Sequence, residues 1–232
     1  LGWRRAYALR DDAFQFTECA REPGRPDETM IMIGIRLDDQ GIPRSLDAEE
    51  ATCYSYLPTE ERSGLRFFVQ GHFDLPVDRE RLSPDSMWNR WILSKVPLQL
   101  SRWALDAFER IGVDRLALAR GLLGVLPLAS ELSEPLFRQI ALELPAAFRD
   151  VTLLPGLDGE VHLLEDTVQL PPDVAALFSD GPTFVTNGGP KAILDPTLPP
   201  RELEVALALG VESLSLTDVV EREIVMGPGG AL

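Results

Sequence analysis

The sequence predicts an α/β fold of the α+β kind, in which an antiparallel-rich sheet with packed helices is followed by a smaller α/β segment. Three observations support this prediction. Runs of β-prone residues fill the first third of the chain, apolar residues recur at three- and four-residue steps in the middle, and the last third mixes short strand-like and helical segments. The chain has 232 residues, which is enough for one large domain or two small ones.

The first third of the chain is expected to form strands. Apolar and polar residues alternate around Phe14 and Phe16, and further β-rich runs follow at 30–37, 52–57 and 65–75. Segments rich in turn-forming residues separate these runs at 23–27, 38–41 and 58–64. Strands joined by short polar loops favour a largely antiparallel sheet with one buried face.

The middle of the chain is expected to be helical. Ser83 followed by Pro84 is typical of a helix start, with an N-cap residue before proline at the first helical position. Pro97 ends or kinks this helix, and Gly112 stops the amphipathic stretch that follows it. The helices expected after Pro97 cover 100–111, 115–125 and 134–148.

The last third is expected to open with a β-hairpin, since the segments 151–154 and 160–164 flank a loop of turn formers. The remaining expected elements are a short helix near 173–178, a strand at 183–185, a Gly/Pro-rich connection at 187–200, and helices at 201–209 and 217–224. These patterns divide the chain into a strand-rich domain with its helices, residues 1–112, and a helical and mixed α/β segment, residues 113–232.

The composition argues against several classes of protein. The chain has 37 acidic and 22 basic residues, a formal charge of −15 and a pI of about 4.5, so direct nucleic-acid binding is not expected. The longest apolar run, 116–132, is broken by Arg120 and Pro127, so no membrane span is expected. Two distant cysteines without a CxxC motif favour a reduced, cytoplasmic, metal-free protein. Because the sequence begins at Leu1 and not at Met, the chain is expected to be a piece of a longer polypeptide.

A search for catalytic motifs finds no P-loop, nucleophile elbow, GxGxxG or HExxH. His72 could act as a general base, but it has no orienting partner nearby in sequence, so a structural role is the preferred interpretation. Three tryptophans at helical spacing, Trp88, Trp91 and Trp103, are expected in the core.

One segment, residues 52–89, resembles sacsin-type proteins. It contains an aromatic strand ending in LPT, a Ser-Gly-Leu turn, a strand of the form F-V-Q-G-x-F-x-L, and then W-N opening a helix. The segments 153–171 and 207–220 also resemble pieces of that family. Sacsin and its bacterial relatives carry modules like the ATPase of heat-shock protein 90, within the GHKL group.

The resemblance implies that this chain is the middle, or transducer, region that follows an ATP-binding domain. The GHKL nucleotide site needs a helix with a catalytic Glu and a magnesium-holding Asn, an Asp-x-Gly-x-Gly loop and a glycine-rich lid, and none of these occurs between Leu1 and Leu232. The resemblance therefore implies an ATP-binding domain upstream of Leu1. It also implies ATP and magnesium for the parent protein and no cofactor in this chain.

A finer resemblance lies at 74–82, DLPVDRERL. In heat-shock protein 90 a loop of the form L-P-L-N-x-S-R-E-x-L supplies an Arg that reaches the ATP γ-phosphate when the domains close. If the present loop is one residue shorter, Arg79 takes that role, and Arg81 is its rival. The family's glutamine four residues after that Arg would fall at Ser83, which cannot reach as far. The alternative is that this alternating-charge run is solvated surface.

Three functional hypotheses follow. The chain is the transducer region of a sacsin-like ATPase that couples ATP binding to chaperone-like remodelling. It is a nucleotide-independent protein-interaction module. Or it is part of a bacterial defence-associated ATPase that acts near nucleic acid through another domain.

Overall fold

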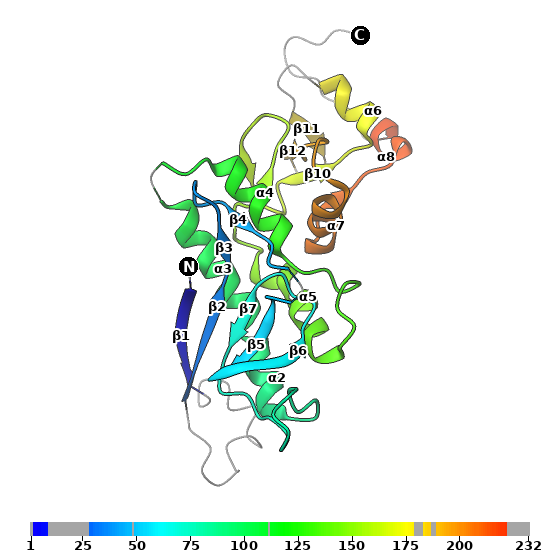
Figure 1. The fold of residues 1–232 in the computed structure, drawn as a ribbon. Coiled ribbons are helices and arrows are strands. Elements are labelled where there is room, and N and C mark those ends of the chain that lie inside the picture. Colours follow the sequence, from blue (N-terminus) through cyan, green and yellow to red (C-terminus); the bar gives the residue numbers. More distant parts are fainter. Residues whose placement is uncertain are drawn as a thin grey trace.

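The computed structural model describes residues 2–8, 28–47, 49–110, 112–178, 183–186 and 189–221. The fold is α+β, as the sequence predicts (Figure 1). The expected strand around Phe14 and Phe16 lies outside the described residues. None of the helices in the described ranges has the length and apolar character needed to cross a lipid bilayer.

The larger sheet has five strands in the order β1-β2-β7-β5-β6. Its strands are β1 (Gly2–Ala8), β2 (Glu28–Gly34), β5 (Thr52–Ser55), β6 (Leu57–Arg62) and β7 (Phe68–Gln70). The pairs β1–β2, β2–β7 and β5–β6 are antiparallel, and β5–β7 is parallel. The sheet is thus largely antiparallel, as predicted, with one parallel pair that the sequence did not indicate.

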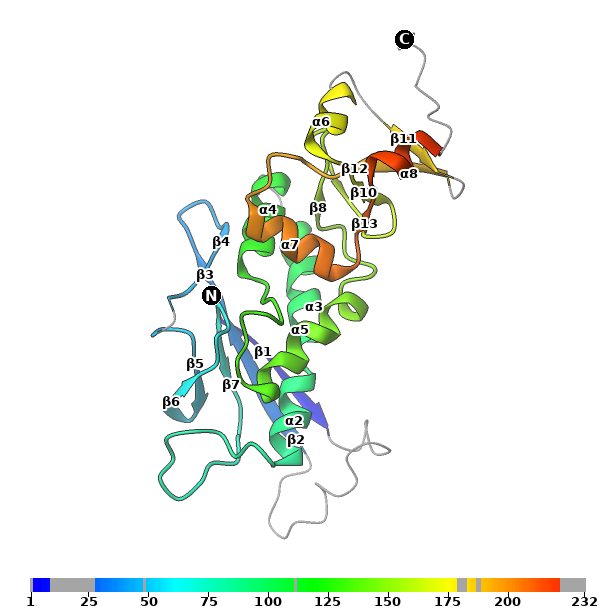
Figure 2. The same ribbon diagram turned by 90° about the vertical axis from the view of Figure 1, so that its right-hand side faces the viewer.

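Helices cover one face of this sheet. They are α2 (Met87–Ser94), α3 (Val96–Phe108) and α5 (Pro135–Ala147), which lie together against the strands in Figure 2. The alternation of β2 places Ile31 and Ile33 in the core, and Gln99 of α3 donates from Nε2 to the Ile31 carbonyl at 3.0 Å. The three tryptophans expected in the core are at most 4 % exposed.

A second layer joins the larger sheet to the smaller part of the molecule. It contains the two-stranded ribbon β3 (Arg36–Leu37) and β4 (Pro43–Arg44), the helices α4 (Arg115–Val125) and α7 (Pro200–Leu209), and the hairpin β8 (Leu154–Pro155) and β9 (Val161–His162). Asp114 caps α4 by accepting from the Ala117 N–H at 3.1 Å. The helices predicted at 115–125 and 134–148, and the predicted hairpin, are confirmed.

The smaller sheet lies at the opposite end of the elongated molecule from the larger one (Figure 1). Its order is β11-β12-β10-β13, from β11 (Thr183–Thr186), β12 (Gly189–Ile193), β10 (Thr167–Gln169) and β13 (Glu212–Ser213). The helices α6 (Pro172–Ala175), η3 (Ala176–Phe178) and α8 (Leu216–Glu221) accompany it. A separate apolar cluster, which includes Val168, Phe178 and Phe184, forms its core.

The larger core is continuous from Ile31 to Val211, so it contains residues from both sides of position 112. Trp91, Phe137 and Phe148 are among its fully buried side chains. The division of the chain at residue 112 stays a prediction.

Three local predictions were wrong. Residues 58–64 were expected to turn, but β6 occupies most of this segment as an edge strand whose inward side chains alternate with exposed polar ones. The first helix is capped by Ser86, whose Oγ accepts from the Asn89 N–H at 3.1 Å, and not by Ser83. The connection at 187–200 contains β12, which pairs with strands on both sides.

Helix α4 packs closely against the β3–β4 ribbon at Gly121 but not at Gly124. A Cβ on Gly121 would lie 2.7 Å from Ile42 Cγ2 and 2.8 Å from the Pro43 carbonyl oxygen, whereas a Cβ on Gly124 would meet nothing closer than 3.4 Å. We expect Gly121→Ala to destabilise the fold by about 1–3 kcal/mol through overpacking. Gly124→Ala, its matched control, should be neutral or stabilising by up to about 1 kcal/mol because alanine is the better helix former. Urea unfolding of both variants checks this, and equal effects would contradict it.

Candidate functional site

The segment that carries both candidate arginines is the loop between β7 and α2. We call residues 74–83 the Arg79 loop. Its two ends meet, because the Ser83 N–H donates to the Asp74 carbonyl at 3.0 Å. Its return half runs along the edge strand β6: the Glu60 N–H donates to the Glu80 carbonyl at 2.8 Å, and the Leu82 N–H donates to Glu61 Oε2 at 2.9 Å. The loop is therefore closed on itself and fixed to the sheet edge.

The tip of the Arg79 loop is a tight turn. The Arg79 N–H donates to the Pro76 carbonyl at 3.0 Å, and Asp78 Oδ1 accepts from the Glu80 N–H at 3.2 Å. Arg79 has a φ of 58°, in the left-handed region that non-glycine residues seldom adopt. Val77, two residues earlier, is completely exposed. The surrounding hydrogen bonds thus hold Arg79 in a backbone conformation that costs on the order of 1 kcal/mol.

The side chain of Arg79 is exposed, and within the described parts of the chain it makes no hydrogen bond or ion pair. Several other arginines are engaged: Arg36 bonds to Glu50, Arg44 to Asp38, and Arg120 to Asp195. The Arg79 guanidinium therefore has its donors available for a group outside this chain.

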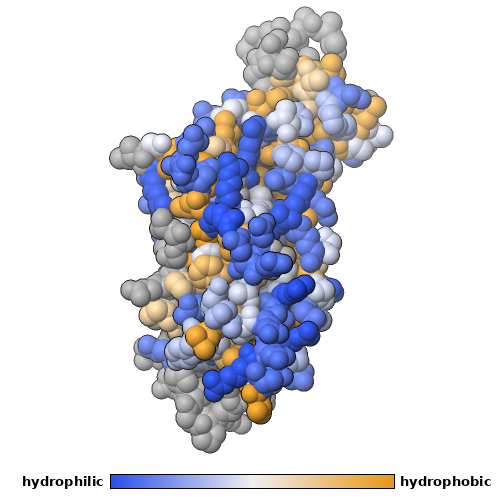
Figure 3. All heavy atoms as spheres, viewed as in Figure 1, coloured by the Kyte–Doolittle hydropathy of each residue, from blue (hydrophilic) through white to orange (hydrophobic). Residues whose placement is uncertain are grey.

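Arg81 has different surroundings. It lines a groove of about 760 Å³ between β6, the Arg79 loop and the start of α5, together with Glu60, Glu61, Glu80 and Glu134. Hydrophilic side chains predominate along this edge of the molecule (Figure 3). Carboxylates around Arg81 repel an approaching phosphate, whereas Arg79 is not part of the groove lining.

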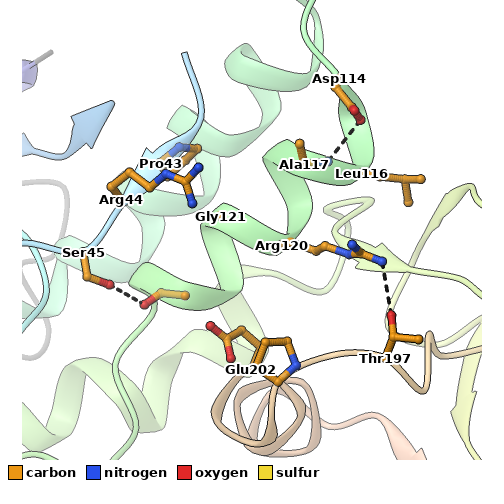
Figure 4. A pocket seen from close by; sticks show the side chains of 12 residues that line it. Pro43, Arg44, Ser45, Asp114, Leu116, Ala117, Arg120, Gly121, Thr197 and Glu202 are labelled. Atoms are coloured by element: carbon orange, nitrogen blue, oxygen red, sulfur yellow. Dashed lines mark hydrogen bonds between the residues drawn. The ribbon is translucent and has the colours of Figure 1, made fainter. Parts of the chain in front are cut away.

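A second cavity, of about 590 Å³, lies between β4, α4 and the start of α7 (Figure 4). Its lining includes Arg44 and Arg120, but also Asp114 and Glu202. Arg44 is paired with Asp38 at 2.8 Å, and Arg120 bonds to Asp195 and Thr197. Both arginines already have carboxylate partners, so the described lining of this cavity offers no free cation to an anionic ligand.

The histidines and the described cysteine show no catalytic arrangement. The His72 ring stacks on Tyr56 with 4.9 Å between ring centroids, and its carbonyl accepts from Trp88 Nε1 at 2.6 Å. His162 bonds to the Asp158 carboxylate at 3.0 Å in the β8–β9 hairpin. Burial raises the pKa of the Cys53 thiol, so this thiol is unreactive near neutral pH. The described residues contain no cluster of three or more His, Cys, Asp or Glu side chains suited to a metal.

Sequence reasoning identified Arg79 and Arg81 but missed the residues that hold their loop. Glu61 is 9 % exposed and accepts from the far end of the loop, and Asn89 is fully buried at the start of α2. A buried polar side chain usually has a specific hydrogen-bond partner. The inward position of Glu61 on an edge strand and the buried position of Asn89 on a helix are the signals that could have indicated such partners. Glu61 binds Leu82, 21 positions away, and Asn89 binds Asp74, 15 positions away, so the sequence could not show these contacts.

Comparison with known proteins finds one partial relative. A stretch of 71 residues, 30% of this chain, is 41% identical to part of the Protein NO VEIN of Arabidopsis thaliana. The chain spans about 2% of the length of that protein. No protein-family model and no solved structure matches the chain. The chain is thus similar, over about a third of its length, to a small part of a much larger plant protein.

Proposed function

We propose that this chain is the middle, transducer-like region of a sacsin-like GHKL-type ATPase. In this proposal an upstream domain binds ATP and magnesium, and the present chain couples nucleotide binding to a conformational change of the chaperone-like, remodelling kind. The observation that carries the proposal is Arg79, an exposed guanidinium without a partner in the described chain, held at the tip of a closed loop. A cytoplasmic location and a protein client belong to the same proposal.

The chemistry of this site suits phosphate. A guanidinium is always charged and presents a planar fork of donors that matches phosphate oxygens. When it contacts the γ-phosphate, it stabilises charge that develops during phosphoryl transfer. Because Arg79 belongs to a domain other than the one that holds the nucleotide, this contact forms only when the two domains close. Hydrolysis then depends on closure, which is how a transducer controls an ATPase.

The surroundings of the two arginines favour Arg79 over Arg81 for this contact. Arg81 faces carboxylates of β6 and of its own loop, which favour a cation and oppose a triphosphate. Arg79 projects from the tip, next to the fully exposed Val77, where a second domain has access. The chain alone is not expected to hydrolyse ATP, because the nucleotide-binding residues of the GHKL group are absent from it.

Closure is testable with a reporter at the loop tip. In the intact polypeptide, Val77→Cys is labelled with an environment-sensitive fluorophore after every cysteine except Cys53, Cys19 included, is replaced by serine. Cys53 can remain because it is completely buried. A non-hydrolysable ATP analogue with magnesium should shift the emission at position 77, because docking of the tip removes the fluorophore from water, and ADP should not.

The matched control is Leu142→Cys on α5, a side chain that is 66 % exposed and belongs to a helix rather than to the Arg79 loop. Its emission should not respond to either nucleotide. An unresponsive label at position 77, or equal responses at both positions, would contradict the proposed function and leave the chain as a nucleotide-independent interaction module.

A further inference from the structure

Asn89 joins the two ends of the Arg79 loop to helix α2. Its Oδ1 accepts from the Asp74 N–H at 2.8 Å, and its Nδ2 donates to the Asp74 carbonyl at 2.9 Å and to the Ser83 carbonyl at 3.0 Å. Its side chain is fully buried. Both amide hydrogens and the amide oxygen are therefore used on the first and last residues of the loop.

No other small side chain can reproduce these three bonds. An aspartate at position 89 could accept from the Asp74 N–H, but its second oxygen would face two carbonyl acceptors without a hydrogen to donate. An alanine would remove all three of these bonds to partly buried backbone groups, which is costly. The amide of Asn89 is thus specific for the closed conformation of the loop.

Helix α2 provides a rigid base for this contact. Ser86 caps the helix and also donates from Oγ to Asp74 Oδ2 at 2.5 Å. Trp88 and Trp91 are buried in the main core with 4.9 Å between ring centroids. Because Glu61 also holds the Leu82 N–H, the ends of the loop are tied to both the helix and the sheet. The tip with Arg79 must then move together with the whole domain.

We propose that Asn89 is the positioning residue for Arg79, which keeps the loop closed so that the guanidinium arrives at the phosphate already oriented. This inference rests on the proposed function of Arg79. A misplacement of about 1 Å in a catalytic contact can cost roughly 100-fold in rate. Asn89 itself touches neither nucleotide nor phosphate, and it acts through the geometry of the loop.

The test uses the intact polypeptide with Asn89→Asp, Arg79→Ala and the double variant. Asn89→Asp should lower the turnover number for ATP about tenfold or more, without changing nucleotide affinity. The double variant should be no slower than Arg79→Ala alone, because a residue that acts through Arg79 has no effect once Arg79 is absent. Hydrogen–deuterium exchange of residues 74–83 should become faster in Asn89→Asp even without nucleotide.

Two further variants keep the result interpretable. Val205→Ala removes a buried contact in α7, far from the loop in sequence, and should lower the melting temperature without changing either loop exchange or turnover. If Asn89→Asp does not fold, Ser86→Ala removes the N-cap of α2 and one bond to Asp74, and should produce the same changes at a smaller size.

Unchanged loop exchange in Asn89→Asp overturns the inference, whatever the ATPase rates are. If Asn89→Asp shows faster exchange but wild-type turnover while Arg79→Ala is slow, the positioning role of Asn89 is also overturned. In that case the proposed function still stands. If Arg79→Ala has wild-type turnover, the proposed function is refuted, and the positioning role of Asn89 is refuted with it. The exchange data then show only whether Asn89 keeps the loop closed.

Discussion

Replacing Arg79 with alanine in the intact polypeptide is expected to lower the turnover number for ATP about 100-fold or more, while nucleotide affinity changes by less than about threefold. The fall corresponds to about 2.7 kcal/mol of lost transition-state stabilisation. In the proposed function the upstream domain binds the nucleotide and Arg79 contacts it only after closure, so affinity is expected to be retained. Steady-state hydrolysis and equilibrium binding of a fluorescent nucleotide measure the two quantities separately.

Arg81→Ala is the matched control, because it removes the same charge from the same loop two residues away. Its turnover should stay within about twofold of wild type, since a solvent-exposed charge outside the reacting site contributes little. Arg79→Lys should recover only part of the rate, because an ammonium lacks the planar fork of donors. Equal losses for Arg79→Ala and Arg81→Ala would show that only the overall charge of the loop matters.

The second large effect is expected at the ion pair that joins three distant segments. Arg201 of α7 donates from Nε and an Nη to the two oxygens of Glu131, each at 2.7 Å, and it also donates to the carbonyls that end α4. Arg66, which precedes β7, donates to the same carboxylate at 3.0 Å. Arg201→Ala should destabilise the fold by about 2–3 kcal/mol, since it leaves partly buried acceptors without donors.

Urea unfolding of Arg201→Ala at neutral pH measures this loss. The control is Arg149→Ala, which removes a positive charge from an exposed position just after α5 and should change stability by less than about 0.5 kcal/mol. Equal stabilities of the two variants would show that the Arg201 network does not hold α7 to the rest of the molecule.

The same network predicts a dependence on pH. Partial burial by itself would raise the pKa of Glu131, but hydrogen bonds from Arg201, the Leu128 N–H and Arg66 outweigh it and lower the pKa from 4.5 to about 2. The stabilisation is therefore complete above about pH 4.5 and is lost as the pH falls toward 2, because the unfolded chain takes up a proton that the folded chain does not. Arg201→Ala should show a shallower loss over this range than wild type.

Much of the fold could be predicted from local patterns. The helices α4 and α5 were predicted as apolar helical segments, the hairpin around Asp158 and Gly159 was predicted from its turn chemistry, and the structure confirms all three. β6 was missed because a polar edge strand with proline near its start reads as a turn, and β12 was missed because it begins with Gly189 and Pro190. The parallel pairing of β5 with β7 depends on long-range packing that no local pattern reports.

The candidate site was predictable only in part. The resemblance of residues 74–82 to a known loop singled out Arg79, which the structure places at an exposed turn. The closure of the loop was not predictable, because Asn89 reaches back 15 positions to Asp74. The pair Trp88-Asn89 at a helix start indicates a buried face. It does not indicate which backbone groups the buried amide of Asn89 will bind.

Chemical rescue of Arg79→Ala tests the central claim most directly. If turnover depends on a guanidinium at the γ-phosphate, guanidinium ion at concentrations below those that unfold the protein should restore much of the turnover of this variant in a saturable manner. Wild type and Arg81→Ala should not respond. Wild-type turnover of Arg79→Ala without added guanidinium, or an equal response of all three proteins, would contradict the account and show that Arg79 does not contact the reacting phosphate.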